Sequence, residues 1–464
     1  MSVLETIGSY FPEVVSPTQK RLPFKEKLKW SLIILIAFLA MGHIPLFGLG
    51  ENALQQFEYL SIILGASFGS IISLGIGPIV TASIVLQLLN GSGILKFDLT
   101  KPEGKAGFQA LQKILSIFFL VFEAVIYVFM GGLAPPAALA GTPAYFSLQW
   151  ILVLQLILGG YMIILMDEVI SKWGFGSGVS LFIAAGVSQG LFLRAINPLP
   201  SLTNPDISAG AIPAMFQFLA RGAPDQALLL LSSVLATLFV FAISVYGQAM
   251  KVEIPLSFGR VRGQGVRWPL NFIYTSNIPV ILIAALLANF QLWARLLQNW
   301  GRPWLGTFVG NVPATGFVRW IHPPDLMNRI LTANLTGLDI AQALSYFLFM
   351  IIGAIIFSYF WMQTSGMDAK SQAKQISAYG LQIPGFRNDQ RVLERLLDRY
   401  IKPLTIMGAV LVGFLAASAD LLGALTSGTG LLLAVMIIYK LYEEIAKQHM
   451  MDMNPMMRKF MGGE

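Results

Sequence analysis

The sequence predicts an all-α integral membrane protein with ten transmembrane helices. Of its 464 residues, 55% are hydrophobic and only 12% are charged, and the mean hydropathy is +0.68. Soluble domains usually carry charge on about a quarter of their residues. Apolar stretches of about 20 residues, the length that crosses a bilayer as a helix, recur along the whole chain. Cysteine is absent, which excludes disulfides, thiolate nucleophiles and cysteine-ligated metals.

The predicted spans are defined by these apolar stretches. The N-terminus carries acidic residues where a cleavable signal peptide would be basic, so we expect the first span to be retained. A further apolar segment, residues 53–68, is too short to cross the membrane and could enter it only partway. The ten spans lie at 30–49, 71–92, 107–132, 146–166, 176–195, 227–249, 268–293, 341–362, 401–419 and 425–443.

The second span is interrupted near its middle by Gly75, Gly77 and Pro78. In lipid every backbone N–H and C=O group needs a partner, so a broken helix is tolerated only where it is buried in protein or lines a watery cavity. Transporters and channels place such broken helices along their pathways. The segment therefore indicates a passage through the membrane. The alternative is a proline-kinked helix packed inside a bundle.

The distribution of lysine and arginine predicts the orientation. With the N-terminus inside, the inner segments hold 25 of the 31 Lys and Arg residues, and the outer segments hold six. The positive-inside rule then places both termini in the cytosol of a protein in the cell membrane. Residues 1–29 form a cytosolic N-terminal segment, 444–464 form a cytosolic tail, and 196–226 form an external connection between two groups of five spans.

Two predicted inner loops, 250–267 and 363–400, are long, basic and rich in Gly and Pro. The second contains an amphipathic helix with Arg391, Arg395 and Arg399 at four-residue spacing. These loops could serve only as orientation signals attracted to anionic lipid. Their length equally favours contact with a large anionic partner, and the residues alone leave both interpretations open.

Motifs for catalysis do not fit their required contexts. Residues 186–190 match a nucleophile-elbow pattern, but they lie in an apolar helix, and the three histidines are scattered. Residues 174–178 resemble a dinucleotide-binding loop only loosely, without a preceding strand. We therefore expect neither an enzyme nor a cofactor or metal site.

Ionisable residues are scarce inside the predicted spans. Glu123 stands nearly alone in the third span, whereas Asp167, Glu168 and Asp420 lie at span ends. Glu123 could be a proton site or a carboxyl held by structural hydrogen bonds. Neutral polar residues are commoner, and their ordinary role is hydrogen bonding between helices. These are Thr81, Gln87, Asn277 and Asn289.

Five segments carry a resemblance to a known family. They read LGIGPIVTASIVLQLL, DEVISKWGFGSGVSLFIAAGVSQ, SNIPVILIAALLANFQLW, IPGFRNDQ and GALTSGTGLLL, in this order. In these motifs the chain resembles the SecY family, the channel-forming subunits of the protein-conducting translocon, and is most similar to the archaeal form. The resemblance covers essentially the whole chain. It implies two pseudo-symmetric inverted halves, 30–195 and 227–443, around a central pore, and such folds place the pathway between the repeats.

The resemblance implies a ring of apolar side chains at the narrowest point of the pore. Two pairs in the set have i, i+4 spacing and so share a helix face. Branched aliphatic side chains can deform around a passing chain and resist ions by dewetting. The implied ring residues are Ile76, Val80, Val179, Ile183, Ile281 and Leu433.

Residues 53–68 resemble the plug of this family, a half-helix that closes the pore from outside. The segment is mostly apolar and ends in small residues, which lets it pack closely and still leave. Without the resemblance it would read as a peripheral amphipathic helix. The implied plug residues are Phe57, Leu60, Ile63, Gly65 and Ser67.

The resemblance also implies a lateral gate between the second and seventh spans, through which hydrophobic segments enter lipid. Thr81, Gln87 and Asn289 would lie along it. The two inner loops resemble those that dock the ribosome, and Arg260, Arg262 and Arg387 are the implied contacts. Arginine suits this role because its guanidinium binds phosphate through paired hydrogen bonds. Val252 and Glu253 depart from the more basic stretch of relatives, which makes contact there doubtful.

The implied function is a passive, gated channel for secretory proteins that also releases hydrophobic segments into lipid. Implied partners are SecE-like and β-type small membrane subunits, the ribosome, signal sequences, nascent polypeptides and the lipid bilayer. The alternative is a ten-span secondary transporter, which would need a substrate site and a coupling ion; the scarcity of charges within the spans argues against it. A scaffold without a pathway would leave the broken helix unexplained.

Overall fold

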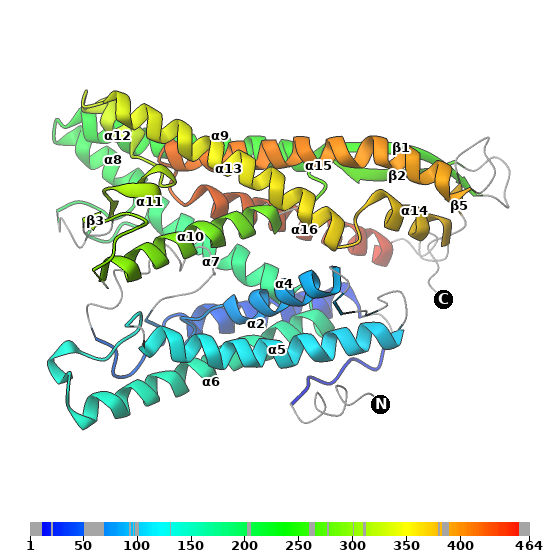
Figure 1. The fold of residues 1–464 in the computed structure, drawn as a ribbon, viewed down its shortest axis with the longest axis horizontal. Helices are drawn as coiled ribbons and strands as arrows, with labels where there is room; N and C mark the ends of the chain where they lie inside the picture. Colours follow the sequence, from blue (N-terminus) through cyan, green and yellow to red (C-terminus); the bar gives the residue numbers. More distant parts are fainter. Residues whose placement is uncertain are drawn as a thin grey trace. The chain divides into compact units, whose positions relative to one another are not determined.

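The computed structural model is mainly helical, and Figure 1 shows its elements in chain order. The chain divides into two compact units. Unit 1 comprises Met1–Gln189 and Ile437–Glu464, and unit 2 comprises Gly190–Met436. The residues that the structure describes are 12–19, 22–50, 69–91, 94–95, 97, 102–129, 131–201, 206–258, 265–275, 278–299, 301–309, 312–378, 381–382 and 389–453.

Unit 1 is built from long helices and one short 3-10 turn, η2 (Ala137–Leu139). Within it α4 packs against α5, α5 against α6, and α2 against α6. Thr142 caps the N-terminus of α6, where its side chain accepts a hydrogen bond from the Tyr145 amide and Pro143 opens the helix. The helices are α2 (Phe24–Met41), α4 (Gly77–Gly91), α5 (Pro102–Phe129), α6 (Pro143–Trp173) and most of α7 (Gly178–Ile196).

Unit 2 repeats this order of neighbours. Here α10 packs against α13, α13 against α15, and α9 against α15. In each unit, therefore, the second long helix packs against the third, the third against the fourth, and the first against the fourth. Such equivalent contacts are expected of an internal repeat. The long helices are α9 (Pro224–Ala249), α10 (Ile278–Asn299), α13 (Gly337–Thr364), α15 (Gln390–Leu421) and α16 (Gly428–Met453), which continues into unit 1.

Shorter elements of unit 2 connect these helices. Strands β1 (Lys251–Phe258), β2 (Gly265–Asn271) and β5 (Leu381–Gln382) form a three-stranded antiparallel sheet in the order β2-β1-β5. A second, two-stranded sheet pairs β3 (Phe308–Val309) with β4 (Val312–Pro313). The short helices are α8 (Ala211–Ala220), α11 (Gly316–Trp320), α12 (Leu326–Leu331) and α14 (Ala369–Ala378).

Each of the ten predicted spans overlaps a helix, although several boundaries were wrong. The first helix ends at Met41, where Gly42 and a turn follow, so residues 42–49 are not helical. The seventh begins at Ile278, because Trp268–Asn271 instead belong to strand β2. Hydropathy alone misplaces these ends, since an apolar strand and an apolar helix terminus score alike.

Six helices in the described part of the chain are long and apolar enough to cross a membrane: α5, α6, α7, α9, α13 and α15. Their outer faces expose large apolar side chains; in α9, for example, Leu235, Leu238 and Phe239 are exposed while Val240 is buried. A soluble monomer rarely exposes continuous apolar faces of this kind. The exposed faces therefore fit a multi-pass membrane protein surrounded by lipid.

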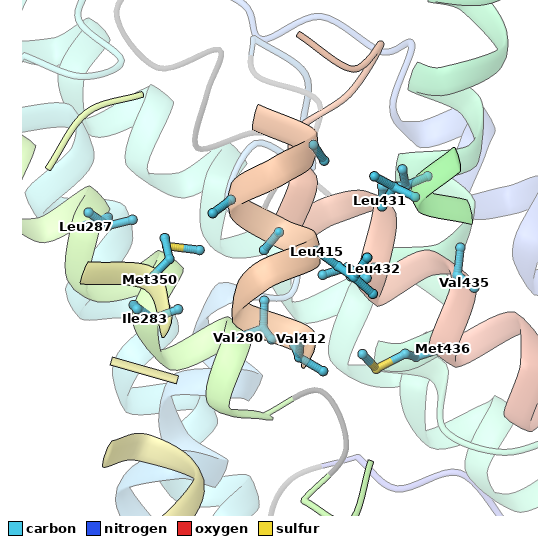
Figure 2. Packing of buried hydrophobic residues seen from close by; sticks show 14 of the residues in the cluster. Val280, Ile283, Leu287, Met350, Val412, Leu415, Leu431, Leu432, Val435 and Met436 are labelled. Carbon is cyan, nitrogen blue, oxygen red and sulfur yellow. The ribbon is translucent and has the colours of Figure 1, made fainter. Parts of the chain in front are cut away.

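The core of unit 2 is formed where α10, α13, α15 and the start of α16 meet. Figure 2 shows Ile283 and Leu287 of α10 close to Met350 of α13, with Val412 and Leu415 of α15 between them and α16. All are at least 95% buried. This packing ties the four helices into one layered bundle.

The two predicted inner loops fold together into one compact region. The three-stranded sheet packs on α14 and on the first half of α15, and a separate apolar cluster fills the space between them. The amphipathic helix predicted around Arg391–Arg399 is confirmed, with Leu393 and Leu397 buried and the three arginines exposed. It continues without interruption into the ninth span as α15, even though Pro403 lies inside it. Leu397, Ile401 and Leu404 pack into the same cluster on both sides of the proline, which offsets its cost.

Candidate functional site

The apolar segment predicted to be broken is indeed broken. Residues 71–76 form consecutive turns, Gly75 has a positive φ of 54°, and helix α4 begins only at Gly77. The segment is anchored by residues that follow α2: the Ile71 amide donates to the Ile44 carbonyl (2.9 Å), and the Leu46 amide donates to the Gly69 carbonyl (2.8 Å). Its backbone groups thus find partners within the protein, which a broken span requires.

Two adjacent glycines of α6 allow close packing, one against this segment and the other against α5. A Cβ atom on Gly159 would lie 1.9 Å from the Ile71 carbonyl oxygen, and one on Gly160 would lie 2.2 Å from Leu120 of α5. Only glycine allows α6 to approach this closely. Gly159 therefore sets the depth at which the turns of 71–76 rest on α6, and Gly160 lets α5 pack closely on the same helix.

Four of the predicted ring residues lie in unit 1. Ile76 ends the turn segment and is 1% exposed, and Val80 follows one turn later, with its amide bonded to the Ile76 carbonyl (3.1 Å). Val179 and Ile183 occupy the first two turns of α7, and Ile183 is 5% exposed. The i, i+4 relation predicted for both pairs is therefore present.

The other two predicted ring residues lie in unit 2. Ile281 is in the first turn of α10 and is half-buried, and Leu433 is in the second turn of α16 and is 1% exposed. Closure of the six into one ring remains a prediction. The predicted plug residues, Phe57, Leu60, Ile63, Gly65 and Ser67, lie outside the described part of the chain.

Of the three predicted gate residues, Thr81 is described in full. Its Oγ1 donates a hydrogen bond to Oε1 of Glu123 (3.2 Å), which joins α4 to α5. Glu123 is thus hydrogen-bonded, as one of its two interpretations required. The side chains of Gln87 and Asn289, on α4 and α10, lie outside the described part.

In the sequence, the predicted arginine contacts follow directly after strands of the three-stranded sheet. Arg260, Arg262 and Arg387 themselves are not among the described residues. The segment 259–264 joins β1 to β2, and the segment 383–388 follows β5, whose Gln382 pairs with Ser257 near the end of β1. Both arginine-bearing segments therefore begin at the same end of one sheet, although they are more than 100 residues apart in sequence.

One other basic residue of this region, Arg267, is paired with an acid. Arg267 on β2 donates to Glu253 on β1 (2.8 Å), diagonally across the hairpin, since Arg267 itself lies opposite Pro255. Weak ribosome contact around Glu253 stays a prediction; it is supported because this carboxylate would repel phosphate and also binds a neighbouring arginine.

The N-terminal segment docks on the end of α6 and on α5, where Lys113 donates to the Pro12 carbonyl (3.1 Å). Lys172 donates to the Glu13 carboxylate (2.8 Å), to the Val14 carbonyl (2.6 Å) and to Glu168 (2.9 Å), and the Trp173 indole donates to the Val15 carbonyl (2.8 Å). The hydrogen bond from Lys172 lowers the pKa of Glu13 below its ordinary value. In the part of the chain that the structure describes, no three His, Asp or Glu side chains are grouped so as to hold a metal ion.

Comparison with known proteins decides the family. The SecY family model matches residues 70–442. The SecY translocase subunit of Methanothermobacter thermautotrophicus is 46% identical over 462 residues, covering 99% of this chain and 98% of that protein. The chain belongs to the SecY family. The SecY subunits of Pyrococcus furiosus and Methanocaldococcus jannaschii are 41% and 39% identical to it, each over 99% of this chain and 99% and 100% of their own lengths.

Solved SecY-type channels share the fold. A protein-conducting channel superposes with a TM-score of 0.78 at 39% identity, covering 96% of this chain and 97% of that one. Sec61 from the canine ribosome–channel complex of the endoplasmic reticulum superposes with a TM-score of 0.75 at 39% identity, with the same coverage. This SecY-family chain therefore has the channel fold.

Sequence reasoning missed three residues that position the SecY-type core. Gly159 was not singled out, although adjacent glycines in the middle of an apolar span are a signal of close packing. Asp167 and Asp420 were noted only as acids at span ends. Each accepts a hydrogen bond from the backbone at the start of the next helix, a role that no local pattern identifies.

Proposed function

We propose that this SecY-family translocase subunit forms a passive, gated pore that moves secretory proteins across the membrane and releases hydrophobic segments sideways into lipid. One observation carries the proposal: an apolar span is broken into anchored turns, and the break leaves Ile76 just before the start of α4 and Val80 in its first turn. Apolar side chains at such a constriction exclude ions by dewetting. They make no specific polar contact, so they accept cargo of varied chemistry.

The lateral gate would lie between α4 and α10. The hydrogen bond from Thr81 to Glu123 attaches α4 to α5, so α4 would move together with α5 when the gate opens. Such a bond contributes only about 1 kcal/mol. The bond between Thr81 and Glu123 can therefore guide the movement of α4 without preventing it. The Glu123 carboxylate, because it accepts this hydrogen bond, is poorly placed to bind a coupling ion.

Both termini would be cytosolic, in the cell membrane. The docking of Glu13 and Val14 on Lys172 supports this, because it places the N-terminal segment at the end of α6 that the positive-inside rule assigns to the cytosol. The tail of α16 supports it as well: Gln448 donates to the Leu22 carbonyl (3.1 Å) and accepts from Lys27 (3.1 Å).

The ribosome would dock on the sheet formed by β1, β2 and β5. Arg260, Arg262 and Arg387 belong to segments that begin at one end of this sheet, and a rigid base under two such segments favours joint contact with one surface. Canine Sec61, which has this fold, was solved in a ribosome–channel complex. Guanidinium groups bind the phosphates of ribosomal RNA well. SecE-like and β-type small subunits would complete the assembly, with the driving force supplied by a partner.

Resting conductance tests the pore directly. Ile76→Ser combined with Ile183→Ser should let ions pass through the resting channel in a planar bilayer, because a wettable neck lacks the dewetting barrier. Leu154→Ser, on an exposed apolar face of α6, is the matched control and should leave the channel sealed. Unchanged conductance in the double variant would place the pathway elsewhere.

Transport itself needs a second measurement. Vesicles that contain the purified complex should take up a radiolabelled preprotein synthesised by bound ribosomes and protect it from added protease. Saturable uptake of a small solute driven by an ion gradient, without preprotein uptake, would instead favour a secondary transporter.

A further inference from the structure

Two carboxylates at equivalent places in the two units each hold the start of the next helix. Asp167 lies near the end of α6, and its Oδ1 accepts a hydrogen bond from the Val179 amide in the first turn of α7 (2.9 Å). Asp420 lies near the end of α15, and its Oδ1 accepts from the Gly428 amide, the first residue of α16 (2.7 Å). In each unit the carboxylate comes from the fourth long helix and the amide from the fifth.

These contacts differ from ordinary helix caps. A normal N-cap side chain belongs to the residue immediately before the helix. Here the acceptor belongs to the preceding helix, 12 residues upstream for Val179 and 8 residues upstream for Gly428. The bond therefore joins one helix to the next and fixes their relative position, which a local cap cannot do.

Glycine makes both contacts possible. A Cβ atom on Gly178 would lie 2.6 Å from the Cα of Asp167, and a Cβ atom on Gly428 would lie 2.1 Å from the carbonyl oxygen of Ala416. Each helix thus begins with a glycine that lies against the backbone of the helix before it. In both connections a further glycine, Gly176 or Gly423, has a positive φ, of 65° and 67° respectively, and turns the chain back.

The helices held in this way carry predicted ring residues. The Val179 amide bonded to Asp167 belongs to a ring residue itself, and Ile183 lies one turn further along α7. Leu433 lies five residues after Gly428 on α16. The Tyr346 hydroxyl of α13 donates to the second oxygen of Asp420 (2.6 Å), so this carboxylate also connects α16 to a third helix.

We propose that Asp167 and Asp420 are paired positioning residues that hold the ring-bearing starts of α7 and α16 and thereby keep the resting pore sealed. The inference rests on the proposed function, because it needs the ring to be the seal. Under the predicted topology Asp167 lies toward the cytosolic side and Asp420 toward the external side. The seal would therefore be held from both sides of the membrane by the same contact, once in each repeat.

The test compares a graded series of variants in the complex purified from membranes. Asp→Asn keeps an acceptor oxygen but loses the charge, and the weaker bond should raise the fraction of time the resting channel conducts by about fivefold at either position. Asp→Ala removes the acceptor and should raise it by roughly tenfold or more. The readout is ion current through single channels in planar bilayers without any translocation substrate.

Asp368 provides the matched control. Its side chain accepts a hydrogen bond from the Ser371 amide (3.2 Å) and so caps α14, a helix that carries no ring residue. Asp368→Ala should lower the thermal unfolding midpoint about as much as a lost cap elsewhere, yet leave the resting current unchanged. A leak in this control as large as in Asp167→Ala would show that general loosening causes the current, and would overturn the proposal.

The double variant Ile76→Ser, Ile183→Ser distinguishes failure of this inference from failure of the proposed function. One outcome is that the double variant leaks while the Asp167→Ala and Asp420→Ala proteins fold and stay sealed. In that case the pore assignment holds and the positioning role of the two aspartates is wrong. If the double variant is also sealed, the pore assignment fails and the inference fails with it. If the Ala variants cannot be purified, the Asn variants decide, and a resting current equal to that of the parent refutes the proposal.

Discussion

Gly159→Ala should strongly destabilise the protein, because it adds one methyl group where no space exists. The new Cβ would lie 1.9 Å from the Ile71 carbonyl oxygen, whereas non-bonded heavy atoms rest near 3.5 Å. The turn segment would have to retreat by more than about 1 Å. Ile71 cannot move freely, since its amide is bonded to Ile44. Overpacking usually costs about 1–3 kcal/mol, and contact with an anchored backbone favours the upper end of that range.

Gly190→Ala is the matched control for this change. Gly190 also lies inside a long apolar helix, α7, but a Cβ there would meet no atom within 4 Å. Alanine is the better helix former, so this variant should be as stable as the parent or more stable, by up to about 1 kcal/mol.

Thermal unfolding in one detergent, at one scan rate, measures the difference between the two variants. Gly159→Ala should unfold several degrees below the parent, and Gly190→Ala at or above it. Because the displaced turns carry Ile76, the Gly159 variant should also leak ions at rest in planar bilayers. Equal unfolding midpoints for the two variants would refute the close approach of α6 to the broken segment.

Three further outcomes are expected. Lys172 lowers the pKa of Glu13, so docking of the N-terminal segment should be complete at neutral pH. It should weaken only once the pH falls below the ordinary carboxyl pKa, because the pKa of the docked Glu13 is lowered. Proteolysis between the docked segment and α2 should then become faster, and Glu13→Gln should lose this pH dependence. Arg387→Glu should reduce ribosome binding in sedimentation assays, less so at high salt, whereas Arg302→Glu, on the predicted external side, should not; equal binding by Arg387→Glu and the parent at low salt would leave this loop as an orientation signal. A cysteine at Ser67 should be protected from impermeant reagent at rest and react once a translocating chain is trapped; identical reactivity in both states would indicate a peripheral helix.

The presence of a helix at each of the ten spans and the break in the second span could be predicted from the residues, whereas several span ends were wrong and the orientation of the chain stays a prediction. Each depends on properties that act locally. Transfer of an apolar stretch into lipid depends on its own composition, orientation depends on nearby Lys and Arg, and Gly75 with Pro78 restricts the backbone where it stands. The family motifs are equally local, and the comparisons confirmed the resemblance they carry.

The contacts between distant residues could not be predicted in this way. The basic loops around Ser257 and Gln382 form one sheet because strands pair wherever packing brings them together. Pro403 remains inside a continuous helix because the apolar side chains on either side of it share one cluster. Asp167 and Asp420 are ordinary acids in the sequence, and their bonds to Val179 and Gly428 exist only because a glycine lets one helix begin against another. Hydropathy specifies which segments enter the membrane, whereas their mutual positions follow from close packing, which depends on the shapes of both partners.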